Sequence, residues 1–90
     1  MEFEWDEVKR QSNITKHDID FQQATALFDG RPVFVAPSPY TYEERFRTTG
    51  ELDDLIITVI WTYRTPKIRI ISARKARHGE RREYRELHDG

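Results

Sequence analysis

Apolar and polar residues in the first third of the chain alternate with a helical period. A first helix is predicted to begin after Asp6, which suits an N-cap, and to run to about His17, although few apolar residues mark its inner face. A second helix is marked more clearly, because Asp20 and Gln23 form the pattern of a capping box and apolar residues follow at helical spacing. Gly30 favours the left-handed conformation that ends helices, so we expect this helix to stop there.

Beyond Gly30 the period changes to two, which is typical of β-strands. Four strands are predicted, at Val33–Ala36, Glu44–Thr49, Leu55–Tyr63 and Lys67–Ala73. The third of these is apolar on both faces and is therefore expected in the centre of a sheet, after a hairpin turn over Gly50–Asp54. A last helix is predicted from about Lys75 to Leu87.

These elements add up to one α+β domain over residues 1–90, because a chain of this length can enclose only one core. The predicted order is two helices, a four-stranded antiparallel sheet and a C-terminal helix. Phe3-Glu4-Trp5 also alternates like a short strand, but the predicted sheet is complete without it.

The composition excludes several kinds of protein. The chain contains no cysteine, which rules out disulfides, thiolate metal ligands and a cysteine nucleophile and fits a reducing compartment. Its first residues are acidic and lack the basic start and apolar stretch of a secretory signal. The longest apolar run, Leu55–Trp61, is too short to span a bilayer. We therefore expect a cytoplasmic protein with no membrane partner.

Charge is distributed unevenly along the chain. Residues 1–63 carry 6 Lys/Arg and 12 Asp/Glu, whereas residues 64–85 carry 9 Lys/Arg and 2 Asp/Glu. One concentrated basic segment in a chain of net charge −1 indicates a local site for a polyanion rather than general affinity for nucleic acid. The alternative is a solvated basic helix face that binds nothing.

The available side chains leave few kinds of hydrolytic site. There is no Gly-rich phosphate loop, and His17, His78 and His88 have no metal-ligand spacing, so neither a cofactor nor a metal site is expected. RNA is a substrate that such a chain could cleave, because its own 2′-OH is the nucleophile. The protein then has to align that oxygen, neutralise charge on the phosphate and move protons, and guanidinium groups neutralise phosphates well.

Several segments, in this order, resemble one known protein family. They are FEWDEVK at residues 3–9, Asn13, Lys16-His17, Phe21–Phe28, Glu44-Arg45-Phe46, RIISARKA at residues 69–76, Glu80-Arg81 and Tyr84. The resemblance covers nearly the whole chain and is to the BrnT toxins. One departure is Asp18, which stands where that family usually has glycine after Lys-His.

The resemblance implies a RelE-like fold and a type II toxin that acts as a ribonuclease and inhibits translation. It also implies a BrnA-like antitoxin as partner, in a toxin–antitoxin dimer or tetramer that represses its own operon. Operator DNA would then be contacted only through the antitoxin complex. Two other functions stay open: a nucleic-acid-binding repressor without catalysis, and a module whose basic surface receives an acidic protein.

Five residues are candidates for catalysis: Arg69, Arg74, Lys75, Glu44 and His17. Arg69 lies mid-strand, where it needs either a carboxylate partner such as Glu44 or a phosphate. Arg74 and Lys75 follow the last strand, a position suited to a phosphate clamp or simply to solvent. Glu44 is a candidate general base or a structural ion-pair partner, and His17 is the histidine best placed to exchange protons.

Five further residues are candidates for RNA binding: Lys16, Arg45, Arg47, Arg77 and Arg81. Lys16 ends the first helix, where a cation also complements the helix dipole. Arg45 and Arg47 share one face of a strand, a common place for exposed arginine. Arg77 and Arg81 lie on one ridge of the last helix with Arg74.

Overall fold

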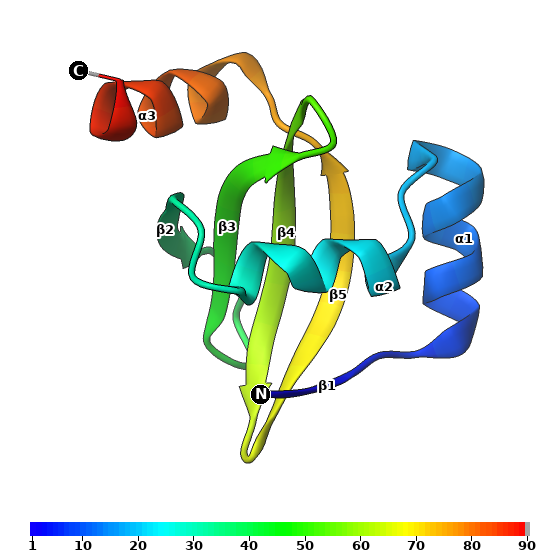
Figure 1. Ribbon diagram of the computed structural model, residues 1–90. Helices are drawn as coiled ribbons and strands as arrows, with labels where there is room; N and C mark the ends of the chain where they lie inside the picture. The colour runs from blue at the N-terminus through cyan, green and yellow to red at the C-terminus, as the bar shows by residue number, and fades with distance from the viewer. Residues whose placement is uncertain (90) are drawn as a thin grey trace.

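The structure is a computed structural model that describes residues 1–89 (Figure 1). In chain order its elements are β1 (Glu2–Glu4), α1 (Glu7–His17), α2 (Phe21–Ala24), the 3-10 helix η1 (Thr25–Phe28), β2 (Val33–Ser38), β3 (Arg45–Leu52), β4 (Leu55–Arg64), β5 (Lys67–Lys75) and α3 (His78–His88). Within this part of the chain, no helix has the length and apolar character needed to cross a membrane.

The sheet has the strand order β1-β5-β4-β3-β2, so β4 is central as predicted. β1 is parallel to β5, whereas all other neighbouring strands are antiparallel. The α+β class is confirmed, but the predicted RelE-like arrangement of two helices followed by a four-stranded antiparallel sheet is wrong. The sheet is mixed, has five strands and begins before the first helix.

β1 is held by contacts between the two ends of the chain. It pairs with Lys67–Arg69, Glu4 forms an ion pair with Arg69, and the ring of Phe3 lies 5.4 Å from that of Phe28. Antiparallel strands can be joined by a short turn whose residues are recognisable in the sequence. Parallel strands such as β1 and β5 are joined by a long connection, so no turn residues indicate that they pair. The alternation at Phe3-Glu4-Trp5 was therefore a strand signal whose partner could not be found locally.

The helix ends follow the predicted capping residues. The Asp6 carboxylate accepts a hydrogen bond from the backbone N–H of Lys9 at 3.0 Å, and α1 ends at His17 as expected. The capping box of Asp20 and Gln23 is present, but the helix it begins changes to a 3-10 helix at Thr25. The second predicted helix is thus two short helical segments.

The strands β2, β3 and β5 end later than predicted, because strand pairing continues further than the sequence pattern suggests. β2 runs through Pro37 to Ser38 rather than ending at Ala36. β3 runs through Gly50 to Leu52, and the turn is only Asp53 and Asp54, with φ of 48° and 68°. Two residues of positive φ form the tight turn that matches the twist of a hairpin. β5 likewise continues to Lys75, so α3 begins at His78 rather than at Lys75.

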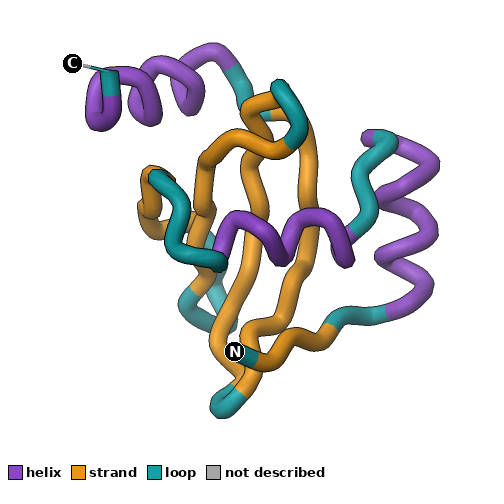
Figure 2. The backbone as a smooth tube through the Cα atoms, in the orientation of Figure 1, coloured by secondary structure: helices purple, strands orange, loops and turns teal. Residues whose placement is uncertain are grey.

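The two faces of the sheet differ in chemistry. One face packs against α2 and η1 and forms the apolar core, with α2 crossing in front of the sheet in Figures 1 and 2, whereas α1 lies beside β5 at the edge of the sheet. Buried core residues are Ile19, Phe21, Ala24, Leu27, Ile57, Val59, Trp61, Ile68, Ile70 and Ala73. The opposite face, called the polar face below, carries Arg45, Arg47, Thr49, Thr58, Thr62, Arg69 and Arg74, and α3 contacts β2 and β3 beside it.

A bulge in β5 determines which side chains reach the polar face. The pairing of β4 with β5 shifts between Ile60 and Trp61, so that Ile71 has no partner residue on β4. Strict alternation would place Arg69 and Arg74 on opposite faces. Because of the extra residue both lie on the polar face, opposite Thr62 and Thr58.

Candidate active site

Five of the ten predicted site residues line one cleft of about 380 Å³, which we call the basic cleft. They are Lys16, His17, Arg74, Lys75 and Arg77. The end of α1 supplies the first two, the end of β5 the next two, and the residue that caps α3 the last. A hollow of about 180 Å³ continues from it between α1 and β5 and shares Lys16 and His17.

Asn13 attaches α1 to β5 next to this cleft. Its side chain is buried; Nδ2 donates to the carbonyl oxygens of Ala73 and Ile19 at 2.8 Å each, and Oδ1 accepts from the N–H of Ala73 at 3.1 Å. The carboxamide thus bonds both the N–H and the C=O of Ala73, as the backbone of a neighbouring strand would. It does so on the edge of β5 that β1 leaves free beyond its own end. This contact sets the distance between the α1 residues and the β5 residues of the cleft.

The cleft contains cationic side chains that no acid neutralises. Within residues 1–89, no carboxylate forms an ion pair with Lys16, Lys75 or Arg77. Lys16 and His17 also lie in the last turn of α1, where the helix dipole favours positive charge. Converging ammonium and guanidinium groups without counter-charges are suited to binding a phosphate.

Arg74 is held rigidly at the wall of the cleft by Glu80 of α3. Its Nη1 and Nη2 donate to the two carboxylate oxygens of Glu80 at 2.6 and 3.0 Å. Glu80 also accepts from the N–H of Arg77 at 2.8 Å and from Oγ1 of Thr58 at 3.1 Å. Burial raises the pKa of Glu80, but the hydrogen bonds from Arg74 and Arg77 outweigh it and bring that pKa down to about 2.

The other predicted basic residues lie outside the cleft, and most are paired with acids. Arg69 pairs with Glu4, Arg45 with Glu43 and Arg47 with Glu83, and Arg81 donates to the carbonyl oxygen of Ala76. The partner of Arg69 is therefore on β1 and is not Glu44. Glu44 is exposed on the loop before β3, where its carbonyl oxygen accepts from Oγ1 of Thr62 at 2.6 Å.

Sequence reasoning gave no role to Asn13 or Glu80, although both organise the cleft. Asn13 could have been found because it is a polar residue in the middle of a helix, on the side that faces the sheet. Glu80 stands in the first turn of α3, where acids commonly cap. Among residues 1–89, no three His, Cys, Asp or Glu side chains lie close enough to hold a metal ion.

Asp18 adopts a left-handed conformation immediately after the cleft residue His17, with φ of 56°. Glycine takes this conformation without the steric cost that a side chain carries. We expect Asp18→Gly to raise the free energy of unfolding by about 0.5–1 kcal/mol, measured by urea denaturation. Asp18→Asn, which keeps a side chain but loses the charge, is the control and should change it by less. Equal effects of the two substitutions would assign the gain to charge instead.

One family model matches the chain over residues 5–80, and its description is ribonuclease toxin, BrnT, of type II toxin-antitoxin system. The matched range contains α1, β2 to β5 and every residue of the basic cleft. No curated protein matches the chain closely enough to count as a relative.

Proposed function

The chain belongs to the BrnT family of ribonuclease toxins of type II toxin–antitoxin systems, and from this premise we propose that the basic cleft is where it cleaves RNA. The observation that supports the proposal is that Lys16, Lys75 and Arg77 line one cleft and that no carboxylate of residues 1–89 pairs with them. A phosphodiester brings the negative charge that this group of cations lacks.

The reaction that suits these residues is attack by the 2′-OH of RNA on the adjacent phosphorus. The new bond joins the 2′-oxygen to phosphorus and the bond to the 5′-oxygen breaks, leaving a 2′,3′-cyclic phosphate and a 5′-OH. The charge that develops on the phosphate oxygens is stabilised by Lys75, by Arg77 and by the side of the Arg74 guanidinium that is turned away from Glu80. The 2′-OH loses a proton in this reaction and the 5′-oxygen gains one. His17, which lines the same cleft, is placed to carry out one of these two transfers.

No divalent metal is required for this scheme, since the cations of the cleft supply the charge that a metal would. Arg69 and Glu44 lie away from the cleft, and we assign them no step in the chemistry. We propose instead that Arg69, with Arg45, Arg47 and Arg81, borders the path of the RNA over the polar face.

The partner of a type II toxin is an antitoxin, and we propose a BrnA-like protein that covers the basic cleft with acidic side chains. A heterodimer or heterotetramer would block the cleft and contact operator DNA through its antitoxin subunits. Release from that complex in the cytoplasm would let the toxin cut RNA and stop translation. Electrostatic complementarity would make this association fast and dependent on salt.

Purified protein incubated with RNA tests the proposed function. We expect cleavage that a chelator such as EDTA leaves unchanged, with products that end in a 2′,3′-cyclic phosphate. RNA carrying 2′-O-methyl groups should bind but resist cleavage, because its nucleophile is blocked. Cleavage that depends on added metal would refute the mechanism. RNA binding without any cleavage would favour a non-catalytic binding module that acts in autorepression.

A further inference from the structure

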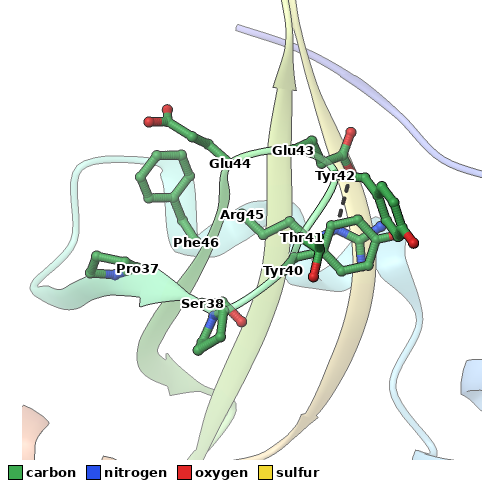
Figure 3. Close-up of a pocket in the computed structure, with 10 residues that line it drawn as sticks. Pro37, Ser38, Tyr40, Thr41, Tyr42, Glu43, Glu44, Arg45 and Phe46 are labelled. Carbon is green, nitrogen blue, oxygen red and sulfur yellow. Dashed lines mark hydrogen bonds and ion pairs between the residues drawn. The ribbon is translucent and has the colours of Figure 1, made fainter.

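Another hollow lies at the other end of the sheet from the basic cleft. It has a volume of about 540 Å³ and is formed by the end of β2, the loop that follows and the start of β3 (Figure 3). Its lining residues are Pro37, Ser38, Pro39, Tyr40, Thr41, Tyr42, Glu43, Glu44, Arg45 and Phe46. Nothing in the cleavage scheme uses it.

Two tyrosines and an arginine gather on one side of this hollow, as Figure 3 shows. The guanidinium carbon of Arg45 lies 3.4 Å from the centre of the Tyr40 ring. The rings of Tyr40 and Tyr42 are 5.7 Å apart and nearly perpendicular. Arg45 is fixed in this position, because its Nε donates to Glu43 at 3.0 Å and Glu43 also accepts from Arg64 at 2.6 Å.

The tyrosines have no part in the core that would explain their presence. Tyr42 is 86% exposed and Tyr40 is 46% exposed, and neither belongs to the buried cluster. Phe46, by contrast, lines the hollow but stacks on Trp61 and packs against the core. Exposed aromatic rings beside a flat guanidinium form a surface on which a planar ring can stack.

The chemistry of this surface favours a base over a phosphate. Arg45 and Arg64 both pair with Glu43, and Glu44 also lines the hollow, so two carboxylates balance the two guanidinium groups and leave little net charge for a phosphate group. Stacking on tyrosine and arginine needs no net charge and suits any nucleobase that is unpaired.

The polar face connects this surface with the basic cleft. Arg45 and Arg47 follow each other on β3, and Nη1 of Arg47 lies 3.9 Å from the Glu80 carboxylate that holds Arg74. Arg45 is level with Thr62 of β4 and Arg69 of β5, and Lys75 lies six residues further along β5, so the separation along the strand is about 20 Å at the usual strand rise. A single RNA strand of a few nucleotides spans that distance.

We propose that Tyr40 and Tyr42 form a subsite that stacks an unpaired base of the RNA a few nucleotides away from the cleaved phosphate. The inference rests on the proposed function and extends it from the reacting phosphate to the recognition of single-stranded RNA. Double-stranded RNA would not use the subsite, because its bases are already stacked.

Tyr42→Ala tests the subsite, with single-stranded RNA blocked by 2′-O-methyl groups as the binding probe. Stacking on an aromatic side chain contributes about 1–3 kcal/mol per base, so we expect the Kd to rise by about 5- to 150-fold. Tyr42→Phe should bind like the wild type, because the ring remains. Val35→Ala, which truncates an exposed side chain in the middle of β2 and outside the hollow, is the control and should change nothing.

The position of the base is found with RNA in which one nucleotide at a time is abasic. The wild type should lose affinity at one position, and Tyr42→Ala should be indifferent to that same change. Equal Kd values for wild type and Tyr42→Ala, with RNA cleavage intact, would overturn the subsite but not the proposed function. Weaker antitoxin binding with unchanged RNA binding would also overturn it, in favour of a protein interface. Absence of both RNA binding and cleavage in the wild type would overturn both proposals.

Discussion

Lys75→Ala is expected to reduce kcat/KM for RNA cleavage by about a hundred- to a thousandfold. Lys75 lines the basic cleft and forms no ion pair with a carboxylate of residues 1–89, so its charge is available to the phosphate. Loss of one group that stabilises transition-state charge costs about 3–4 kcal/mol of activation free energy. Because the side chain is exposed, the free energy of unfolding should be unchanged.

Lys67→Ala is the matched control for this substitution. Lys67 is an exposed lysine at the opposite end of the same strand, and it lies outside the cleft. It should alter kcat/KM by less than about threefold, as expected for a change in long-range charge alone. Equal losses in the two variants, or full activity of Lys75→Ala, would mean that the cleft does not hold the reacting phosphate.

Arg69→Ala distinguishes the contribution of the polar face to RNA cleavage from that of the basic cleft. Arg69 pairs with Glu4 and lies opposite Thr62, away from the cleft. Its removal should weaken β1 and RNA binding more than the chemical step, which appears as a change in KM with kcat retained. Arg74→Ala is less informative, because it leaves Glu80 buried without its partner and tests stability together with catalysis.

Local sequence signals were sufficient for most of the fold. Leu55–Tyr63 is apolar on both faces and is the central strand β4, and the Asp20–Gln23 capping box begins α2. β1 was missed as part of the sheet because its stability comes from Lys67–Arg69 and Phe28. Contacts between distant segments leave no periodic trace in either one.

The sequence named the residues that line the basic cleft, but not how they are arranged, and their role in catalysis stays a prediction. The basic stretch that ends β5 does meet the end of α1, and this brings Lys16 and His17 to Arg74 and Lys75. Charge counts could not tell which arginines form an ion pair with a carboxylate, because pairs such as Arg69 with Glu4 join opposite ends of the chain. The bulge at Ile71 also escaped prediction, because an inserted residue changes the facing of side chains without changing residue type.

Glu80→Gln is expected to lower the free energy of unfolding at neutral pH by about 3 kcal/mol. Glu80 is 8% exposed and binds both guanidinium nitrogens of Arg74, so the substitution leaves a largely buried cation with a neutral partner. Glu83→Gln is the matched control, one turn further along α3. Glu83 pairs with Arg47 but its side chain is 38% exposed, so its loss should cost less than about 1 kcal/mol.

The pH dependence of the free energy of unfolding should identify the Glu80 carboxylate as the source of this contribution. Its pKa is about 2 in the folded protein and 4.5 when unperturbed, so the folded state favours the charged form. The contribution is complete above pH 4.5 and is lost as the pH falls toward 2, because the unfolded chain then binds the proton first. The difference corresponds to about 3 kcal/mol, and urea denaturation between pH 7 and pH 2.5 should show most of it in the wild type. Glu80→Gln should lack that part of the acid sensitivity, whereas Glu83→Gln should retain it. A wild-type acid profile in Glu80→Gln would place the acid-sensitive group elsewhere and leave Arg74 without the rigid support that the cleft requires.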